Sequence, residues 1–253
     1  MIKKYIFLVT IFSVQFLFSQ ENIVKDNTNT WFTILNRLTI NSKWSVSNEL
    51  HERQGAFYSE HATFLWRPSI DYHLNADVEI SFGYSYINNE PNKPNINPKI
   101  NAIENNIWEQ VLLKHKIGKV NFQHRFRQEH RWYDKITMGS SGNFRKSGTD
   151  FANRFRYRIT VNTPIKTFDN GKEIFFQGFD EIWILQTEGL APKSFSRNWL
   201  YLGLGYKFNA KTNLQLGYMN QWDVLGNDNY VSTPIIQTTF IRNFDLLYKK
   251  NAQ

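Results

Sequence analysis

The segment RFRYRIT, residues 154–160, alternates three arginines with aromatic and aliphatic residues. Successive side chains of a β-strand point to opposite faces, so the arginines share one face and Phe155, Tyr157 and Ile159 share the other. On a helix the same residues would wrap around the axis and form no stripe. The segment therefore predicts a strand with one charged and one apolar face.

The same alternation recurs along the chain. In residues 77–87, large apolar side chains alternate with small or polar ones. These segments run for about 10 to 13 residues, whereas strands of globular proteins cluster near five or six and a tilted membrane-spanning strand needs about 9 to 11. The faces of residues 105–116 and 173–186 are not assigned by this pattern. Further alternating segments are 43–53, 62–74, 121–133, 154–160, 198–208 and 213–218.

The connections between these segments alternate in length. Tight turns are expected at 41–43, 75–77, 117–119 and 209–212, and long polar connections at 88–104, 134–149, 187–196 and 225–232. Short turns at one rim and long loops at the other are typical of outer-membrane barrels. We therefore predict an all-β fold, an antiparallel transmembrane β-barrel with short periplasmic turns and long extracellular loops. A secreted soluble β-sandwich is the alternative.

The expected strand count is ten or twelve. Eleven strand-like segments are visible in the sequence, but bacterial single-chain barrels have even numbers of strands. Either residues 21–29 or the tail past Phe244 supplies a twelfth strand, or the first segment lies outside a ten-stranded barrel.

The N-terminus has the pattern of a secretory signal peptide. Lys3 and Lys4 precede a mostly apolar stretch of residues 5–18, which is short for a membrane helix. We predict a signal peptide at 1–20, a mature N-terminal segment at 21–29 and a single barrel domain at 30–250. The chain has no cysteine, which excludes a disulfide framework. The expected location is the cell outer membrane.

Several blocks resemble a known family in their order and spacing. They are TWFTILNRLTINSKWSVSNELHER (30–53), HRFRQEHRW (124–132), NRFRYRITVNTP (153–164) and DEIWIL (180–185). The chain resembles a family of exported proteins of Bacteroidota-type bacteria, catalogued as a domain of unknown function (2490). The resemblance implies an outer-membrane barrel and a Gram-negative host, and it implies no activity or site residues.

The polar faces of the strands, placed together, predict a charged barrel interior. Oppositely charged neighbours there form a salt-bridge ladder that fills the lumen, because a guanidinium matches a carboxylate in two hydrogen bonds. The other reading is an arginine excess that attracts small anions or an anionic ligand. The expected lumen carboxylates are Glu49, Asp71, Glu79 and Glu129, and the arginine strip that forms the candidate anion site is Arg125, Arg127, Arg131, Arg154, Arg156 and Arg158.

Signals for chemistry are weak. Ser69, Asp71 and His73 share one face of one strand, but alternate residues are about 6.6 Å apart, so a catalytic triad needs partners from neighbouring strands. We expect no catalytic residues, no cofactor and no metal site, and no nucleic-acid partner because the arginines point into a barrel. The expected function is a structural scaffold or a narrow arginine-lined pore with weak anion preference, in contact with outer-membrane lipid. The alternatives are a surface protein that binds an extracellular or outer-membrane protein partner through its long loops, and an outer-membrane lipid-modifying hydrolase.

Overall fold

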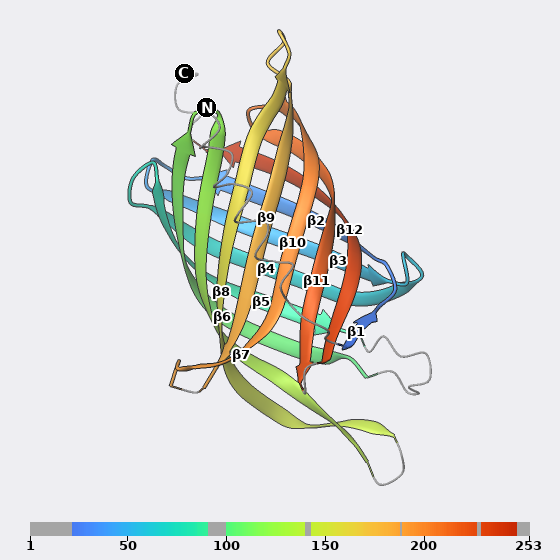
Figure 1. Cartoon of the computed structure of the whole chain (residues 1–253). Coiled ribbons are helices and arrows are strands. Elements are labelled where there is room, and N and C mark those ends of the chain that lie inside the picture. The colour runs from blue at the N-terminus through green and yellow to red at the C-terminus, as the bar shows by residue number, and fades with distance from the viewer. Residues whose placement is uncertain (1–21, 91–99, 140–142, 188, 227–228, 247–253) are drawn as a thin grey trace, which may run out of the picture.

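The computed structural model describes residues 22–90, 100–139, 143–187, 189–226 and 229–246, which form β-strands joined by turns (Figure 1). The predicted signal peptide and the middle of the 88–104 connection lie outside these residues. No helix in the described part of the chain is long and apolar enough to span a membrane. The strands are β1 (Asn22–Lys25), β2 (Asn29–Thr39), β3 (Trp44–Gly55), β4 (Glu60–His73), β5 (Val78–Asn89), β6 (Ala102–Ile117), β7 (Val120–Met138), β8 (Phe144–Thr167), β9 (Glu173–Gln186), β10 (Pro192–Asn209), β11 (Thr212–Gly226) and β12 (Asn229–Asp245).

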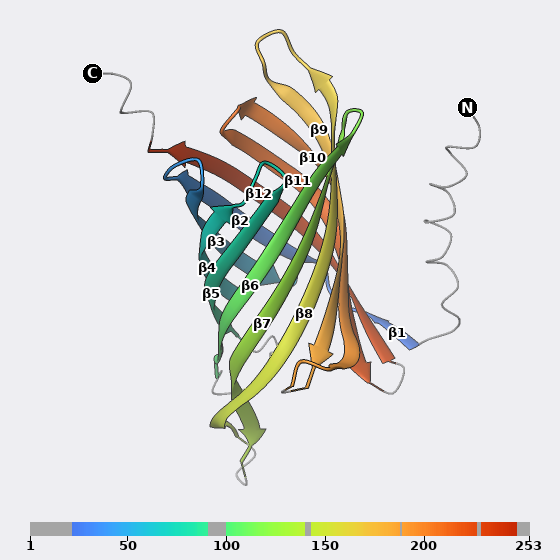
Figure 2. The same ribbon diagram turned by 90° about the vertical axis from the view of Figure 1, so that its left-hand side faces the viewer.

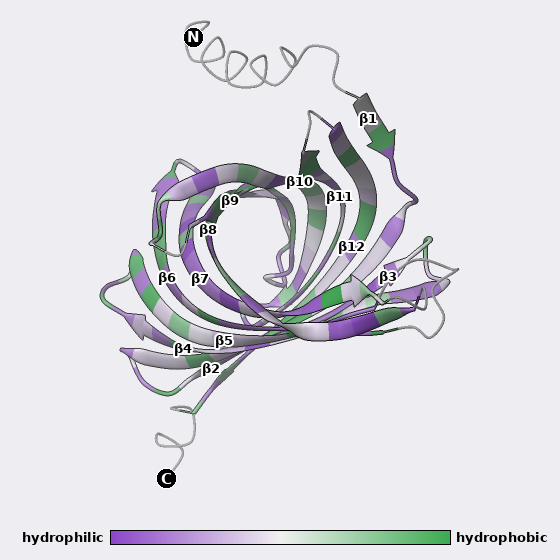
Figure 3. Cartoon of the chain, turned by 90° about the horizontal axis from the view of Figure 1, so that it is seen from below, coloured by the Kyte–Doolittle hydropathy of each residue, from purple (hydrophilic) through white to green (hydrophobic). Residues whose placement is uncertain are grey.

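The strands form one sheet that closes on itself, which confirms the predicted barrel. From β2 to β12 each strand pairs antiparallel with the next in chain order, and β2 also pairs with β12. Seen end-on, the strands wrap around a single interior (Figure 3). The closed ring has eleven strands, so the expectation of an even-numbered ring was wrong. In an odd-numbered meander the first and last strands run in the same direction, and β2 and β12 indeed pair in parallel.

The twelfth strand of the sheet, β1, comes from the predicted N-terminal segment 21–29. It pairs in parallel with residues 229–232, and β2 pairs with the following residues of the same strand. β1 therefore continues the edge that β2 occupies and adds no strand to the ring. Because β2 and β12 run in parallel, β2 begins at one rim of the barrel, and β12 ends at the other (Figure 2).

The two rims differ less in connection length than predicted. The connection from β5 to β6 is long, but β10 already begins at Pro192 within the expected loop 187–196, and Gly226 pairs with Asn229 within the expected loop 225–232. At the turn rim the hairpins from β2 to β11 connect through short turns, such as the one between Ile117 and Val120. At the loop rim, strand pairing continues into the predicted 134–149 connection, where residues 135–138 pair with 144–148. The structure therefore replaces that expected loop with a β-hairpin of β7 and β8 that extends beyond the barrel (Figure 1).

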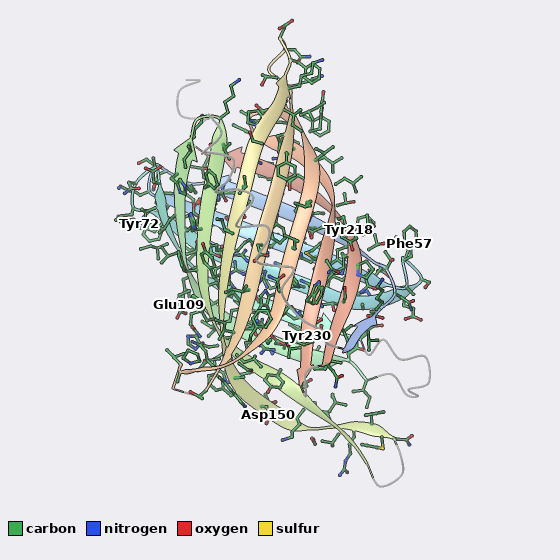
Figure 4. All side chains as sticks on the ribbon, viewed as in Figure 1. Phe57, Tyr72, Glu109, Asp150, Tyr218 and Tyr230 are labelled. Carbon is green, nitrogen blue, oxygen red and sulfur yellow. The ribbon has the colours of Figure 1, made fainter. Side chains whose placement is uncertain are left out.

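The two faces of the strands separate as the alternation predicts. Leu204, Leu216 and Phe82 point outward and are 55%, 58% and 61% exposed, while inward-facing Ser45 and Ser85 are fully buried. Tyr72 and Tyr218 are among the side chains that project from the outer surface (Figure 4). The outside of the barrel is thus broadly apolar and the inside largely polar.

The two unassigned segments place aromatic residues inside the barrel. In β9, Phe175, Phe179 and Trp183 point inward, and in β6 Trp108 does so. The inner face of β9 combines these rings with the buried Glu181, and its outer face places Asp180 among apolar residues. Polar and apolar residues therefore occur on both faces, which explains the ambiguous pattern. The buried apolar cluster inside the ring comprises Trp31, Phe179, Trp183, Trp199, Tyr201, Met219 and Ile235.

Glycines on the inner face make room for these rings. The Trp108 ring lies over Gly83, its register partner on the neighbouring strand. A Cβ added at position 83 would lie 2.2 Å from the nearest carbon of that ring. Phe175 covers Gly205 in the same way, at 2.1 Å from a built Cβ. Large rings therefore lie flat against the wall of the interior, which raises the packing density of a barrel this wide.

Candidate functional site

The six arginines of the predicted strip all lie on the inner faces of β7 and β8, which are neighbouring antiparallel strands. Arg127 faces Arg156 across the register, and Glu129 faces Arg154. Like charges opposite each other repel, so the two strands alone cannot balance the strip. Carboxylates from other strands supply the compensation.

Glu181 of β9 is the largest contributor to this balance. Its carboxylate accepts hydrogen bonds from Arg125 at 2.6 Å, from Arg156 at 2.7 Å and from the Nε of Arg158 at 2.8 Å. Glu181 is fully buried and Arg156 is 2% exposed. A carboxylate with two oxygens can accept this many donors because each oxygen has two lone pairs.

Arg156 links Glu181 to a second carboxylate. Its Nη1 donates to Glu129 at 2.7 Å, and Glu129 also accepts from Arg154 at 2.5 Å. The chain of pairs then continues to Glu104 of β6, which lies 3.7 Å from the Arg154 guanidinium. Charge therefore alternates in sign along a continuous path inside the wall.

Glu104 ends this path in a bidentate pair. The Nε and Nη2 of Arg131 donate to its two oxygens at 2.7 and 2.9 Å. We call the group formed by Arg125, Arg131, Arg154, Arg156, Arg158, Glu104, Glu129 and Glu181 the arginine–glutamate belt.

Arg127 is held differently from the other five arginines. It donates twice to Gln110 of β6, at 3.0 and 2.7 Å, and stacks over the Trp108 ring, 4.0 Å from its centroid. Its nearest carboxylate, Glu49 of β3, is 3.9 Å away and is shared with Arg67 at 2.8 Å. A guanidinium over an aromatic face gains electrostatic attraction from the ring.

Two of the predicted carboxylates lie in a separate cluster nearer the turn rim. Glu79 accepts two hydrogen bonds from Arg37 of β2, at 3.0 and 2.7 Å, and one from Lys114 of β6 at 3.3 Å. Asp71 lies 3.4 Å from the same Arg37 and accepts from Ser69 at 3.1 Å. Both predicted carboxylates are therefore engaged by cations or hydroxyls.

His73, from the sequence motif Ser69, Asp71 and His73, contacts residues of neighbouring strands. His73 Nε2 lies 2.9 Å from Ser45 Oγ of β3, and its Nδ1 lies 3.4 Å from Glu79 of β5. This order of nucleophile, base and carboxylate has the connectivity of a catalytic triad. Ser45 is fully buried in the wall, so a substrate carbonyl has no space beside its Oγ. The cluster acts as packing in this conformation.

Four charged members of the belt and the turn-rim cluster escaped the sequence analysis: Glu181, Glu104, Arg37 and Lys114. Glu181 lies in the segment 173–186, which has no clean alternation, and Glu104 lies at the end of the expected loop 88–104. Neither residue was therefore assigned to a face. The available signal was the charge balance itself, because residues 125–131 and 154–158 contain all six strip arginines and one carboxylate, Glu129. Among the described residues no group of histidines, carboxylates or cysteines could hold a metal ion.

A family model matches residues 28–231, which run from the start of β2 into β12 and include every residue of the belt. The chain belongs to the family described as protein of unknown function (DUF2490). The predicted family is therefore confirmed. No curated protein and no solved structure matches the chain. The barrel, the belt and the turn-rim cluster are thus features of a DUF2490 domain.

Gln128, a polar residue in the middle of an outward face, has its partner on the outside of this DUF2490 barrel. It donates to Gln186 of β9 at 2.6 Å. Beside it, His130 lies 2.8 Å from Asn153 Oδ1 and 3.3 Å from Glu109. We call Glu109, Gln128, His130, Asn153 and Gln186 the outer polar cluster. It spans β6 to β9.

Proposed function

We propose that this DUF2490 protein is an outer-membrane barrel that serves as a membrane-embedded scaffold with a sealed interior, not as a pore. The membrane location is supported by the apolar outer surface, since soluble proteins rarely expose contiguous apolar patches larger than a few hundred Å². Outward leucines such as Leu202 and Leu204 suit contact with lipid, and the polar inner faces suit a barrel lumen.

The burial of interior side chains carries the proposal of a sealed lumen. An aqueous channel leaves the residues that line it exposed to water. Here Leu65, Tyr201, Met219 and Ile235, from four different strands, are at most 2% exposed, as are Arg156 and its two glutamates. The low exposure of these side chains supports an interior that the belt and the buried apolar cluster close to water.

Fractionation tests the location. We expect the protein in the outer-membrane fraction, extractable only with detergent, and migrating faster on a gel before boiling than after boiling because a closed barrel resists unfolding. Recovery from the periplasm without detergent would refute the membrane assignment.

Liposome swelling tests the seal. Proteoliposomes diluted into an iso-osmotic solution of a small sugar should swell no faster than protein-free liposomes. A well-characterised porin reconstituted in parallel verifies that the assay detects permeation. Swelling that rises in proportion to the amount of this protein contradicts the proposal.

A partner-binding role is the second candidate, and the outer polar cluster favours it. A charged or amide side chain that faces lipid is costly, yet Glu109 is half exposed on the outside of β6, opposite Gln128 of β7. A photo-crosslinking residue at position 109 should capture a protein partner in intact membranes, whereas one at Ile34, on the outer face of β2, should capture none. Equal yields at both positions would remove this candidate.

We propose no hydrolytic role. The buried Ser45 gives a direct test, since Ser45→Ala should leave any ester hydrolysis by the purified protein unchanged. Loss of a measurable wild-type activity in this variant would establish the enzyme reading in place of the scaffold.

A further inference from the structure

A cavity opens from the turn rim into the interior between β6 and β10. Its volume is about 550 Å³, within the range of small-molecule sites. The strands around it are contiguous, because Lys116 is the register partner of Asn121, Asn121 of Asn162, and Glu173 of Lys207. The cavity is lined by Lys116, Lys119, Asn121, Asn162, Pro164, Ile165, Thr167, Glu173 and Lys207.

The charge of this lining is predominantly positive. It contains three lysines and one glutamate. Glu173 accepts a long hydrogen bond from Thr167, at 3.5 Å. Within the described residues, none of the three lysines has a carboxylate within ion-pair distance, although Lys114, one inward position before Lys116, reaches Glu79 at 3.3 Å. The belt arginines deeper in the barrel have carboxylate partners within ion-pair distance, and these lysines do not.

The shape of the site strengthens its field. A cleft lined by one sign of charge with low-dielectric walls concentrates field lines and raises the local concentration of counter-ions. Arg125 and Arg158, two inward positions deeper than Asn121 and Asn162, belong to the belt that closes the interior. A ligand therefore enters from the turn rim and stops at the belt.

We propose that this cavity binds a compact polyanion that carries phosphate or carboxylate groups. The ammonium groups of Lys116, Lys119 and Lys207 are compact charges with three donors each, which suits them to phosphate and carboxylate oxygens. The amides of Asn121 and Asn162 add neutral donors on the wall between them. The site uses none of the belt arginines, and it requires no passage through the barrel.

Calorimetry on the purified full chain in detergent, with tripolyphosphate and citrate as probes at low ionic strength, tests the site. We expect one-to-one binding of at least one probe. The Lys116→Gln, Lys207→Gln double variant should bind at least tenfold more weakly, since a unit-charge contact at about 4 Å in water is worth roughly a factor of five. The Lys146→Gln, Lys193→Gln double variant, an equal charge change on the loop-rim side, is the matched control and should bind like wild type.

Three results overturn the proposal: no binding of either probe, an unaltered affinity in the Lys116→Gln, Lys207→Gln variant, or an equal loss in the Lys146→Gln, Lys193→Gln control, which would show attraction to net charge alone. Gel migration before boiling verifies that each variant is folded. If the double variant is unfolded, Lys119→Gln in the turn between β6 and β7 replaces it, with an expected loss of about fivefold. A sealed barrel with an empty cavity would leave the scaffold proposal intact, so the two proposals fail separately.

Discussion

Replacing Glu181 with glutamine removes one negative charge from the centre of the belt while keeping the size of the side chain. In the wild type this carboxylate accepts from Arg125, Arg156 and Arg158. Glutamine offers one acceptor oxygen and adds an NH₂ group that faces guanidinium donors. The variant therefore leaves buried positive charge without its counter-ion.

The expected loss of stability follows from how buried these partners are. Breaking a buried ion pair by removing one partner costs about 3–5 kcal/mol. The Arg125 and Arg158 side chains are 14% and 21% exposed and can turn partly towards water, whereas Arg156 is 2% exposed but keeps Glu129. We expect a loss near the lower end, about 3 kcal/mol, which corresponds to roughly 6–12 °C in the melting temperature of a chain of this size.

Thermal unfolding in detergent, followed by the loss of fast gel migration or by circular dichroism, measures this loss. Glu173→Gln on the same strand, exposed to the turn-rim cavity, is the matched control and should lie within about 1 kcal/mol of the wild type. A melting temperature of Glu181→Gln within two degrees of the wild type would refute the view that the belt stabilises the barrel.

Three further predictions concern the packing, the topology and the turn-rim cluster. Gly83→Ala should destabilise the barrel by about 1–3 kcal/mol, because the added Cβ overlaps the Trp108 ring. Gly189→Ala, whose added Cβ has no neighbour within 4 Å, is the control. Equal melting temperatures of the two variants would contradict the predicted overlap. Cysteines placed singly at Val24 and at Leu246, in a chain that has no cysteine, should react with an impermeant reagent from opposite sides of the membrane. The reason is that β1 lies at the loop rim and β12 ends at the turn rim. Labelling of both positions from one side would rule out the parallel β2–β12 closure. Arg37→Met should lower the melting temperature, because it leaves Glu79 with Lys114 as its remaining hydrogen-bonded cation, and Lys43→Met, an exposed turn residue, should not; equal effects would show that the cluster adds no stability.

The sequence predicted the faces of the strands where one face is polar. In β3, β4, β5, β7 and β8 an alternation of period two distinguishes an apolar outer surface from a polar interior, and the structure agrees. It failed for β9, where the inner face carries aromatic rings and Glu181, and the outer face carries isoleucines and Asp180. Each face of such a strand mixes apolar and charged residues, so alternation does not distinguish them.

The charge partners and the strand count could not be read from local pattern. Which carboxylate meets Arg156 depends on the register of β8 against β9, which is set by the whole closed sheet. The alternation did reveal that the arginine strip lacked compensation, but not that Glu181 supplies it. The odd ring arises because β2 and β12 pair in parallel, and no residue in either strand signals the direction of a neighbour 200 residues away.

Single-channel recording in planar bilayers tests the sealed interior most directly. Wild-type protein, inserted and verified as folded, should give no steady conductance in potassium chloride at any applied voltage that the bilayer tolerates. The Arg127→Ala, Arg156→Ala double variant should be less heat-stable, and any conductance that it shows should be absent from the wild type. A stable ohmic conductance in the wild type, with preference for chloride over potassium, would contradict the sealed barrel and establish the arginine-lined pore.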